Sequence, residues 1–202
     1  MLDRAAPAAI APALQAVARR LVALGVGADV LTLVGFGLGL LGALAIALHA
    51  PLVGLALLLA SRLCDGLDGA VARLTRPTDA GAFLDIALDF LFYASVPLAF
   101  ALADPAANAL PAAVLLASFI GSGCSFLAFA VLAERRGLQS TAYPHKGIYY
   151  LGGLAEASET LASFALMCLW PALFAWWAYG FAVLCGLSTF GRVLGGWRAL
   201  RV

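Results

Sequence analysis

The sequence predicts an all-α integral membrane protein with six transmembrane helices and an amphipathic, interfacial helix at the N-terminus. Two observations predict this fold class. Of 202 residues, 64% are hydrophobic and only 11% are charged, and the mean hydropathy is +1.00, whereas soluble domains carry about 25% charged residues. Six apolar runs are each long enough to cross a bilayer, which takes about 20 helical residues. The whole chain, 1–202, is predicted to form a single membrane domain.

The predicted interfacial helix covers residues 8–24. Apolar side chains recur there every three or four positions, as at Ile10, Leu14 and Leu21, and polar side chains such as Arg19 lie between them. This period gives a helix one apolar and one polar face. A helix of that kind is suited to lie in the membrane interface before the first span.

The six predicted spans are separated by short turns. They lie near residues 30–49, 52–73, 80–102, 110–133, 148–169 and 174–196. With a cytoplasmic N-terminus, the inside segments hold most of the lysines and arginines, and the outside turns near 50, 103–109 and 170–173 hold none. This asymmetry follows the positive-inside rule. We therefore predict an integral protein of a bacterial inner (plasma) membrane, with residues 65–89 facing the cytoplasm.

The basic residues also bear on possible partners. Twelve lysines and arginines are spread over the chain, and they form no basic face of the kind that binds nucleic acid. The lipid bilayer is the expected environment, and nucleic acid is not an expected partner.

Four carboxylates lie within a stretch of 25 residues, at Asp65, Asp68, Asp85 and Asp89. Lipid does not solvate an ionisable side chain, so such residues within a membrane indicate function by default. The first two are three residues apart and the last two are four apart, so each pair lies on one helix face. Because a short connection makes the two spans antiparallel neighbours, we expect all four carboxylates to converge on one cavity.

Four anions in one cavity repel each other strongly in a low dielectric unless cations or protons neutralise them. Oxygen ligands with water access favour Mg²⁺ or Mn²⁺, and two such ions about 4 Å apart suit displacement at phosphorus. Gly69 and Gly81 leave room for a phosphate beside the backbone, and Arg73 offers a forked contact to it. The alternative is a buried salt network that joins two helices, with Arg62, Arg73 and Arg76 as the nearby cations.

The pattern D-x2-D-G-x2-A-R, followed by G-x3-D-x3-D, resembles the signature of the CDP-alcohol phosphatidyltransferase family. The residues that match this signature are Asp65, Asp68, Gly69, Ala72, Arg73, Gly81, Asp85 and Asp89. The resemblance implies a homodimeric membrane enzyme of phospholipid biosynthesis. Such an enzyme transfers a phosphatidyl group from CDP-diacylglycerol to a polar alcohol acceptor and releases CMP.

The resemblance also implies roles for individual residues. Asp65, Asp68 and Asp85 would hold a pair of Mg²⁺ or Mn²⁺ ions, and Asp89 would ligate one ion and act as the general base. The residues implied in binding the CDP-lipid are Asp29, Thr32, Asp65, Gly69, Ala72, Arg73 and Gly81. For Asp29 and Thr32 the alternative is a helix cap and a hydroxyl bonded to its own helix.

The remaining polar residues are candidates for binding the acceptor. Lys146 and Arg192 are predicted near the cytoplasmic ends of their helices, where relatives that use a phosphorylated alcohol bind its phosphate. Glu156 and Glu159 are predicted about midway through the fifth span. They would bind acceptor hydroxyls, pair with Arg192, or, as protonated groups, hydrogen-bond to neighbours such as Ser158.

The sequence thus predicts phosphatidyl transfer, with glycerol 3-phosphate as the first choice of acceptor. Inositol phosphate, serine or another amino alcohol, and phosphatidylglycerol stay open as acceptors. The alternative from another functional class is a divalent-cation transporter that uses the aspartates as a transit site. The outer halves of the predicted spans are nearly free of polar residues, which argues against a transit path.

Overall fold

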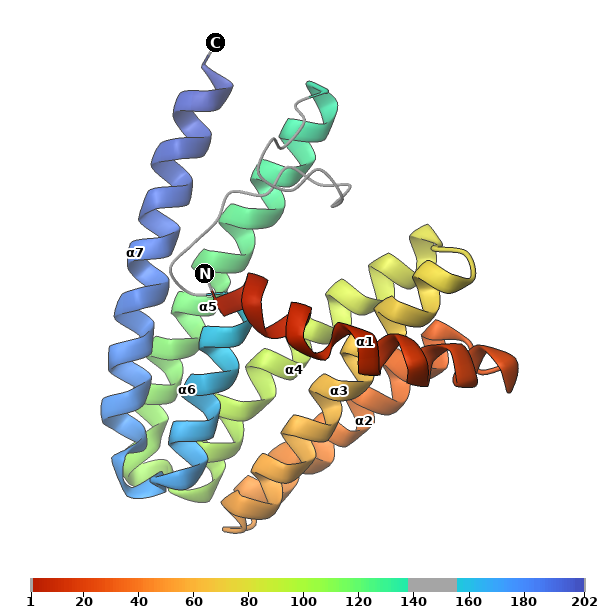
Figure 1. Ribbon diagram of the computed structural model, residues 1–202. Helices are drawn as coiled ribbons and strands as arrows, with labels where there is room; N and C mark the ends of the chain where they lie inside the picture. The colour runs from red at the N-terminus through yellow and green to blue at the C-terminus, as the bar shows by residue number, and fades with distance from the viewer. Residues whose placement is uncertain (1, 138–155, 202) are drawn as a thin grey trace.

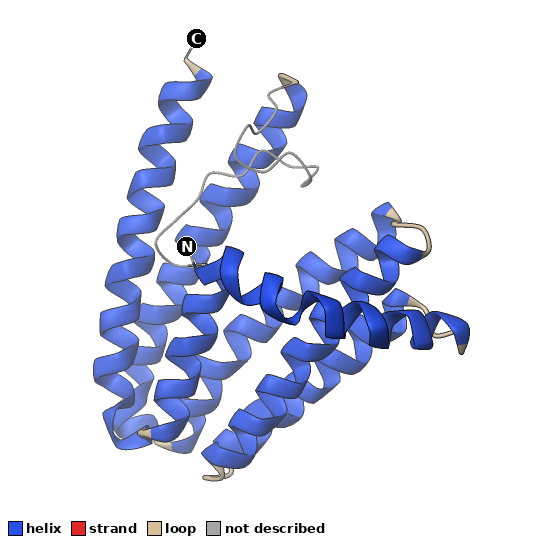
Figure 2. Cartoon of the chain, viewed as in Figure 1, coloured by secondary structure: helices blue, strands red, loops and turns tan. Residues whose placement is uncertain are grey.

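The computed structural model describes residues 2–137 and 156–201, and within these residues every regular element is helical (Figure 2). The elements are α1 (Leu2–Ala23), α2 (Ala28–Ala47), α3 (Pro51–Leu74), α4 (Asp79–Ala103), α5 (Pro105–Arg135), α6 (Ala157–Leu169), the 3-10 turn η1 (Pro171–Leu173) and α7 (Phe174–Leu200). Figure 1 shows the long helices crossing the molecule in alternating directions, with α1 lying across α2 and α3. The α2–α3, α4–α5 and α6–α7 turns share the lower end, and the α3–α4 turn and the C-terminus lie toward the upper end.

The helices agree with most of the predicted spans. Four segments are long and apolar enough to cross a membrane, namely Ala28–Ala47, Asp79–Ala103, Pro105–Arg135 and Pro171–Leu200. Helix α3, with 24 residues, is also long enough to cross a membrane. It is not among these four apolar segments, and it carries the charged side chains of Arg62, Asp65, Asp68 and Arg73. The predicted span near 148–169 is described only in its second half, as the 13 residues of α6; residues 148–155 lie outside the described part. Helix α1 begins at Leu2 rather than at residue 8.

The N-terminal helix is held against the bundle by a small apolar cluster. Ala18 of α1 is fully buried, and it packs with Leu31 of α2 and with Ala70 and Val71 of α3. The exposed Arg19 lies beside it on the outward face of α1. The side of α1 that carries Ala18 therefore covers the ends of α2 and α3.

Helices α2 and α3 approach each other closely along a row of glycines. A Cβ atom added at Gly35 would lie 2.9 Å from Cβ of Cys64, and one added at Gly42 would lie 3.1 Å from the carbonyl oxygen of Gly54. One added at Gly39 would lie 2.5 Å from the ring of Phe92 on α4. Small residues let helix backbones approach in this way. This row fixes the distance between α2 and the face of α3 that carries the aspartates.

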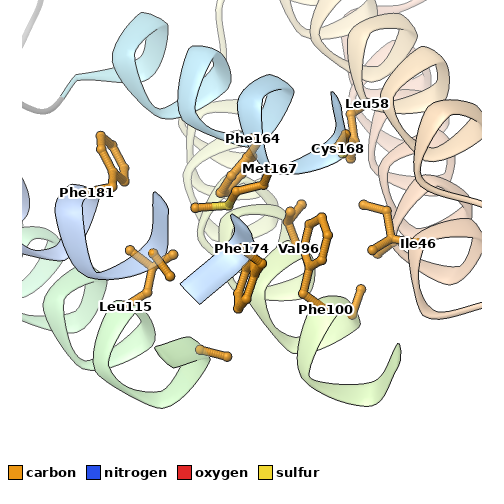
Figure 3. Packing of buried hydrophobic residues seen from close by; sticks show 14 of the residues in the cluster. Ile46, Leu58, Val96, Phe100, Leu115, Phe164, Met167, Cys168, Phe174 and Phe181 are labelled. Atoms are coloured by element: carbon orange, nitrogen blue, oxygen red, sulfur yellow. The ribbon is translucent and has the colours of Figure 1, made fainter. Parts of the chain in front are cut away.

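A core rich in aromatic side chains fills the space between α4, α5, α6 and α7 (Figure 3). Phe92, Phe164 and Phe174 are fully buried. The rings of Phe100 and Phe174 stack with centroids 4.5 Å apart. Phe92 and Phe164 meet edge to face, with centroids 6.4 Å apart. This core anchors α4 below the carboxylates that the helix carries.

The glycine row yields a matched pair of substitutions in one helix. Gly39→Ala should lower the free energy of unfolding by about 1–3 kcal/mol, because its Cβ must displace the buried ring of Phe92. Gly37 has no atom within 4 Å of an added Cβ, so Gly37→Ala should be neutral or stabilising by up to about 1 kcal/mol. Thermal unfolding of the purified protein in detergent measures both. Equal midpoints for the two variants would contradict the close packing of α2 against its neighbours.

Candidate functional site

Three aspartates from two helices meet at one point. Asp65 and Asp68 are one turn apart on α3, and Asp85 lies near the start of α4; one carboxylate oxygen of each lies within 4.8 Å of the others. The short α3–α4 turn makes this possible, and it ends at Thr78, whose side chain accepts a hydrogen bond of 3.0 Å from the amide of Gly81. Oxygens on opposite sides of one Mg²⁺ are about 4.2 Å apart. The three aspartates therefore fit a divalent cation.

Asp89 lies one turn after Asp85 on α4 but belongs to a different set of contacts. Its Oδ1 accepts a hydrogen bond of 2.6 Å from Nη1 of Arg62. The same Nη1 donates to Oδ1 of Asp65 over 3.2 Å. Arg62 thus bridges the two helices, and the fourth carboxylate is paired with this cation.

Helix α2 contributes a hydroxyl to the cluster. Oγ1 of Thr32 lies 2.7 Å from Oδ2 of Asp68 and 3.2 Å from the carbonyl oxygen of Ala28. A hydroxyl has one proton to donate, and the carboxylate is the nearer and charged acceptor. Thr32 therefore orients Asp68, which is itself only 6% exposed.

These side chains surround a small polar cavity between α2, α3 and α4. Its volume of about 10 Å³ is that of a single water molecule or ion. The lining residues are Thr32, Gly35, Phe36, Arg62, Asp65, Asp68, Asp85, Leu88 and Asp89. The four carboxylates therefore do converge on one cavity, as the helical spacing predicts.

The charge balance distinguishes a metal site from a salt network. Among the side chains that the structure describes, the ion pairs of these carboxylates are the two made by Arg62. Arg73 is exposed and lies over Gly69, where an added Cβ would be 3.2 Å from its Nη1. Arg76 is exposed in the turn. One guanidinium does not neutralise four carboxylates, which leaves strong attraction for a further cation.

Five of the residues predicted to bind a nucleotide lie at the same end of α2, α3 and α4, in a group of three and a pair. Arg73 covers Gly69 on α3, and Ala72 is half-buried beside them. On the other side, a Cβ added at Gly81 would lie 3.0 Å from Oδ1 of Asp29, so the first turns of α2 and α4 are neighbours. The amide of Gly81 is capped by Thr78, which explains how the first turn of α4 is fixed.

A second cavity of about 600 Å³ lies between α4, α5, α6 and α7. Its walls are mostly apolar, and their polar side chains are those of Asp89, Tyr93, Ser122, Glu156, Thr160 and Arg192. Arg192 on α7 is 7% exposed, and its Nη1 donates to Oγ of Ser122 over 2.9 Å. Asp89 lines both cavities and so connects the carboxylate cluster to this larger space.

Glu156 and Glu159 lie at the start of helix α6 and not in the middle of a helix. Glu156 is the N-cap of α6, and the helix begins at the next residue. Oε2 of Glu159 accepts hydrogen bonds from the amide of Glu156, at 3.3 Å, and from the hydroxyl of Ser158, at 3.0 Å. The two glutamates therefore form a capping box at the first turn of α6, and Glu156 also lines the larger cavity.

The sequence analysis names Arg62 only as a nearby cation of the alternative salt network, and it does not name Ser122. Arg62 lies three residues before Asp65, on the same helix face, so its spacing is a signal that could have identified it. Ser122 is 70 residues from Arg192, and no local pattern links them. Lys146 lies outside the described residues.

Comparisons with known proteins agree with this geometry. The family model described as CDP-alcohol phosphatidyltransferase matches residues 26–188. The inner membrane protein YnjF of Escherichia coli (strain K12) is 51% identical over 201 residues, covering 100% of this chain and 98% of its own length.

Solved structures show that the fold is shared. The phosphatidylinositol phosphate synthase PgsA1 of Mycobacterium tuberculosis, with CDP-DAG bound, has a TM-score of 0.72 at 22% identity and covers 91% of this chain and 93% of its own. The same synthase with manganese and citrate has a TM-score of 0.71 at 22% identity, with 91% and 88% covered. At this identity the likeness concerns the fold.

The contact between Thr32 and Asp68 predicts a change in metal affinity. Thr32→Val should weaken Mn²⁺ binding by roughly tenfold or more, because removing a hydrogen bond that orients a ligand typically costs that much. Thr32→Ser keeps the hydroxyl and should bind Mn²⁺ as the original protein does. Titration of the purified full-length protein, followed by the paramagnetic resonance signal of free Mn²⁺, gives both constants. A valine variant with unchanged affinity would show that Thr32 does not support a metal ligand.

Proposed function

Because this chain belongs to the CDP-alcohol phosphatidyltransferase family, we propose that it transfers a phosphatidyl group from CDP-diacylglycerol to an alcohol, with release of CMP. The observation that carries the proposal is the meeting of Asp65, Asp68 and Asp85 within 4.8 Å, with Asp89 in the same cavity. The synthases of the same fold that hold CDP-DAG or manganese support both the lipid substrate and a divalent ion.

The carboxylate cluster is the proposed metal site. Asp65, Asp68 and Asp85 would hold Mg²⁺ or Mn²⁺, since their oxygens suit hard cations. The bound cation supplies positive charge, which polarises a phosphoryl oxygen and stabilises the departing phosphate. Thr32 keeps Asp68 oriented toward the cavity, which supports a role in positioning a ligand. A second ion with Asp89 among its ligands stays part of the prediction.

Asp89 is the proposed general base. Its carboxylate would accept the proton of the acceptor hydroxyl while the hydroxyl oxygen forms a bond to the phosphorus of the phosphatidyl group. The bond from that phosphorus to the bridging oxygen of the diphosphate breaks, and CMP leaves with the electron pair. The support is positional, because Asp89 lines both the carboxylate cavity and the larger one.

The CDP moiety is proposed to lie along the cytoplasmic ends of α2, α3 and α4. Arg73 is exposed there and suited to a forked contact with phosphate. Gly69 and Gly81 lack side chains next to Arg73 and Asp29, respectively, so a ligand can approach the backbone at both places. Ala72, small and half-buried on the next turn of α3, adds to that space.

The cavity of about 600 Å³ is the proposed acceptor site. Arg192 is nearly buried within it and is held by Ser122, an arrangement that suits the phosphate of a phosphorylated alcohol. This favours glycerol 3-phosphate or inositol phosphate over serine or a free amino alcohol, and it also admits phosphatidylglycerol. Glu156 lines the same cavity, and its carboxylate is suited to accept hydrogen bonds from the hydroxyls of the alcohol substrate. A role for Lys146 stays a prediction from the sequence.

The proposed setting is the cytoplasmic leaflet of an inner membrane, as for the E. coli relative, an inner membrane protein. We propose that α2 to α7 provide six spans, that α1 lies in the interface, and that residues 1–202 act as one domain in a homodimer. Basic residues at the ends of α1, α5 and α7 would mark the cytoplasmic side.

The reaction can be measured directly with the purified protein. Formation of labelled CMP from CDP-diacylglycerol should require Mn²⁺ or Mg²⁺ and one acceptor from a panel of alcohols, and EDTA should abolish it. Asp89→Asn should lower the rate by roughly a hundredfold or more through loss of the base, while the three other aspartates still bind Mn²⁺. Divalent-ion flux into liposomes without CMP formation would instead support a transporter.

The proposed acceptor site predicts that a substitution of Arg192 changes KM for one substrate and not for the other. Arg192→Gln should raise KM for a phosphorylated acceptor by roughly tenfold or more, because a charge-assisted contact is lost, and leave KM for CDP-diacylglycerol unchanged. Arg198→Gln, two turns later on α7 and exposed, is the matched control and should change neither. An equal rise in both KM values would place Arg192 outside the acceptor site.

A further inference from the structure

Arg62 places a fixed positive charge inside the carboxylate cluster. Its Nη1 donates to Asp65 over 3.2 Å and to Asp89 over 2.6 Å, and its Nη2 lies 3.4 Å from Oγ of the fully buried Ser61. A guanidinium nitrogen of this type carries two protons. Both protons of Nη1 are therefore used by carboxylates from two different helices.

Aromatic rings hold the guanidinium in this position. Its central carbon lies 3.9 Å from the centroid of the Phe92 ring and 5.8 Å from that of Tyr93. Both rings come from α4, one turn after Asp89, so they share its helix face. The side chain of Arg62 is only 14% exposed, and cation–π contacts gain strength where water is excluded. The arginine has a built site of its own beside the proposed metal ligands.

The two sites share one carboxylate. Asp65 is one of the three aspartates that meet at one point, and it is also one of the two carboxylates bound by Arg62. Asp89 is bound by Arg62 and lies outside the three-aspartate group that the described residues form. A cation held by Asp65 and Asp89 would lie close to the guanidinium, because Nη1 contacts one oxygen of each carboxylate.

We propose that Arg62 is a resident cation that competes with a second divalent ion for Asp65 and Asp89. This inference rests on the proposed function, and it concerns the order in which the site fills. The first ion binds to Asp65, Asp68 and Asp85 without displacing the guanidinium. The second ion binds only as Arg62 gives up its contact with Asp89, so Arg62 is a positioning residue that sets the affinity for that ion.

A purely structural role for Arg62 makes a different prediction. As a link between α3 and α4, Arg62 would contribute to the free energy of unfolding and leave the affinity for ions unaffected. As a competing cation, Arg62 lowers the affinity for the second ion by electrostatic repulsion. A unit charge about 5 Å from a divalent ion changes its dissociation constant by roughly tenfold, even at the dielectric constant of water.

The test is a Mn²⁺ titration of the full-length protein in detergent, followed by the resonance signal of free Mn²⁺. The unsubstituted protein should bind one ion tightly and a second more weakly. In Arg62→Gln the second dissociation constant should fall by roughly tenfold or more. Arg62→Lys keeps the charge without the fork, and its second constant should lie between the other two.

Arg76→Gln is the matched control, because it removes one positive charge from the exposed α3–α4 turn. It should leave both dissociation constants unchanged. The proposal is overturned if neither Arg62 variant shifts the second constant, or if Arg76→Gln shifts it equally. Should Arg62→Gln not fold, Arg62→Met, which also removes the charge, takes its place, and an unchanged second constant overturns the proposal.

The CMP assay separates the two proposals. Unchanged ion binding in the Arg62 variants of a chain that forms CMP would overturn only the competition. A chain that forms no CMP with any acceptor overturns the proposed function, whatever the titration gives.

Discussion

The repulsion among four carboxylates is the constraint on which the rest of this structure depends. Asp65, Asp68, Asp85 and Asp89 are brought together by two antiparallel helices joined by a short turn, and their mutual energy is high in a low dielectric. The fold holds them by several independent means. Thr32 donates to Asp68, Arg62 bridges the other pair of charges, and the row of glycines between α2 and α3 brings that hydroxyl within reach.

The same constraint explains why the two cavities have opposite character. The small cavity is lined largely by polar groups and is the size of one ion, whereas the large one is mostly apolar, with polar groups at a few points. Asp89 is the residue at their junction, which is where a proton must pass if an alcohol in the large cavity is to attack a phosphate held beside the small one. The buried core packs around the second half of α4, including Val96 and Phe100, and holds that helix in place (Figure 3).

Much of this arrangement can be predicted from sequence, because helix periodicity and a short turn are local. The i, i+3 spacing of Asp65 and Asp68 and the i, i+4 spacing of Asp85 and Asp89 suffice to predict one cavity. Contacts between distant segments are not predictable in this way. The pairing of Arg192 with Ser122 depends on how α5 packs against α7. Hydropathy alone likewise does not reveal that a helix begins directly after Glu156, with Glu159 accepting a hydrogen bond from the Glu156 amide.

The charge of the cluster connects the resting site with the proposed reaction. With all four carboxylates ionised and Arg62 in place, the cluster carries three negative charges; one divalent ion leaves one negative charge, and two leave one positive charge. A second ion bound without substrate would therefore lie within a few ångströms of the positive charge of Arg62 and be repelled by it. A diphosphate lipid brings negative charge of its own, and with it the second ion and the guanidinium are both compensated. The proposed competition by Arg62 would thus link full occupancy of the site to the presence of the nucleotide lipid, and Asp89 would stay paired with Arg62 until the lipid binds.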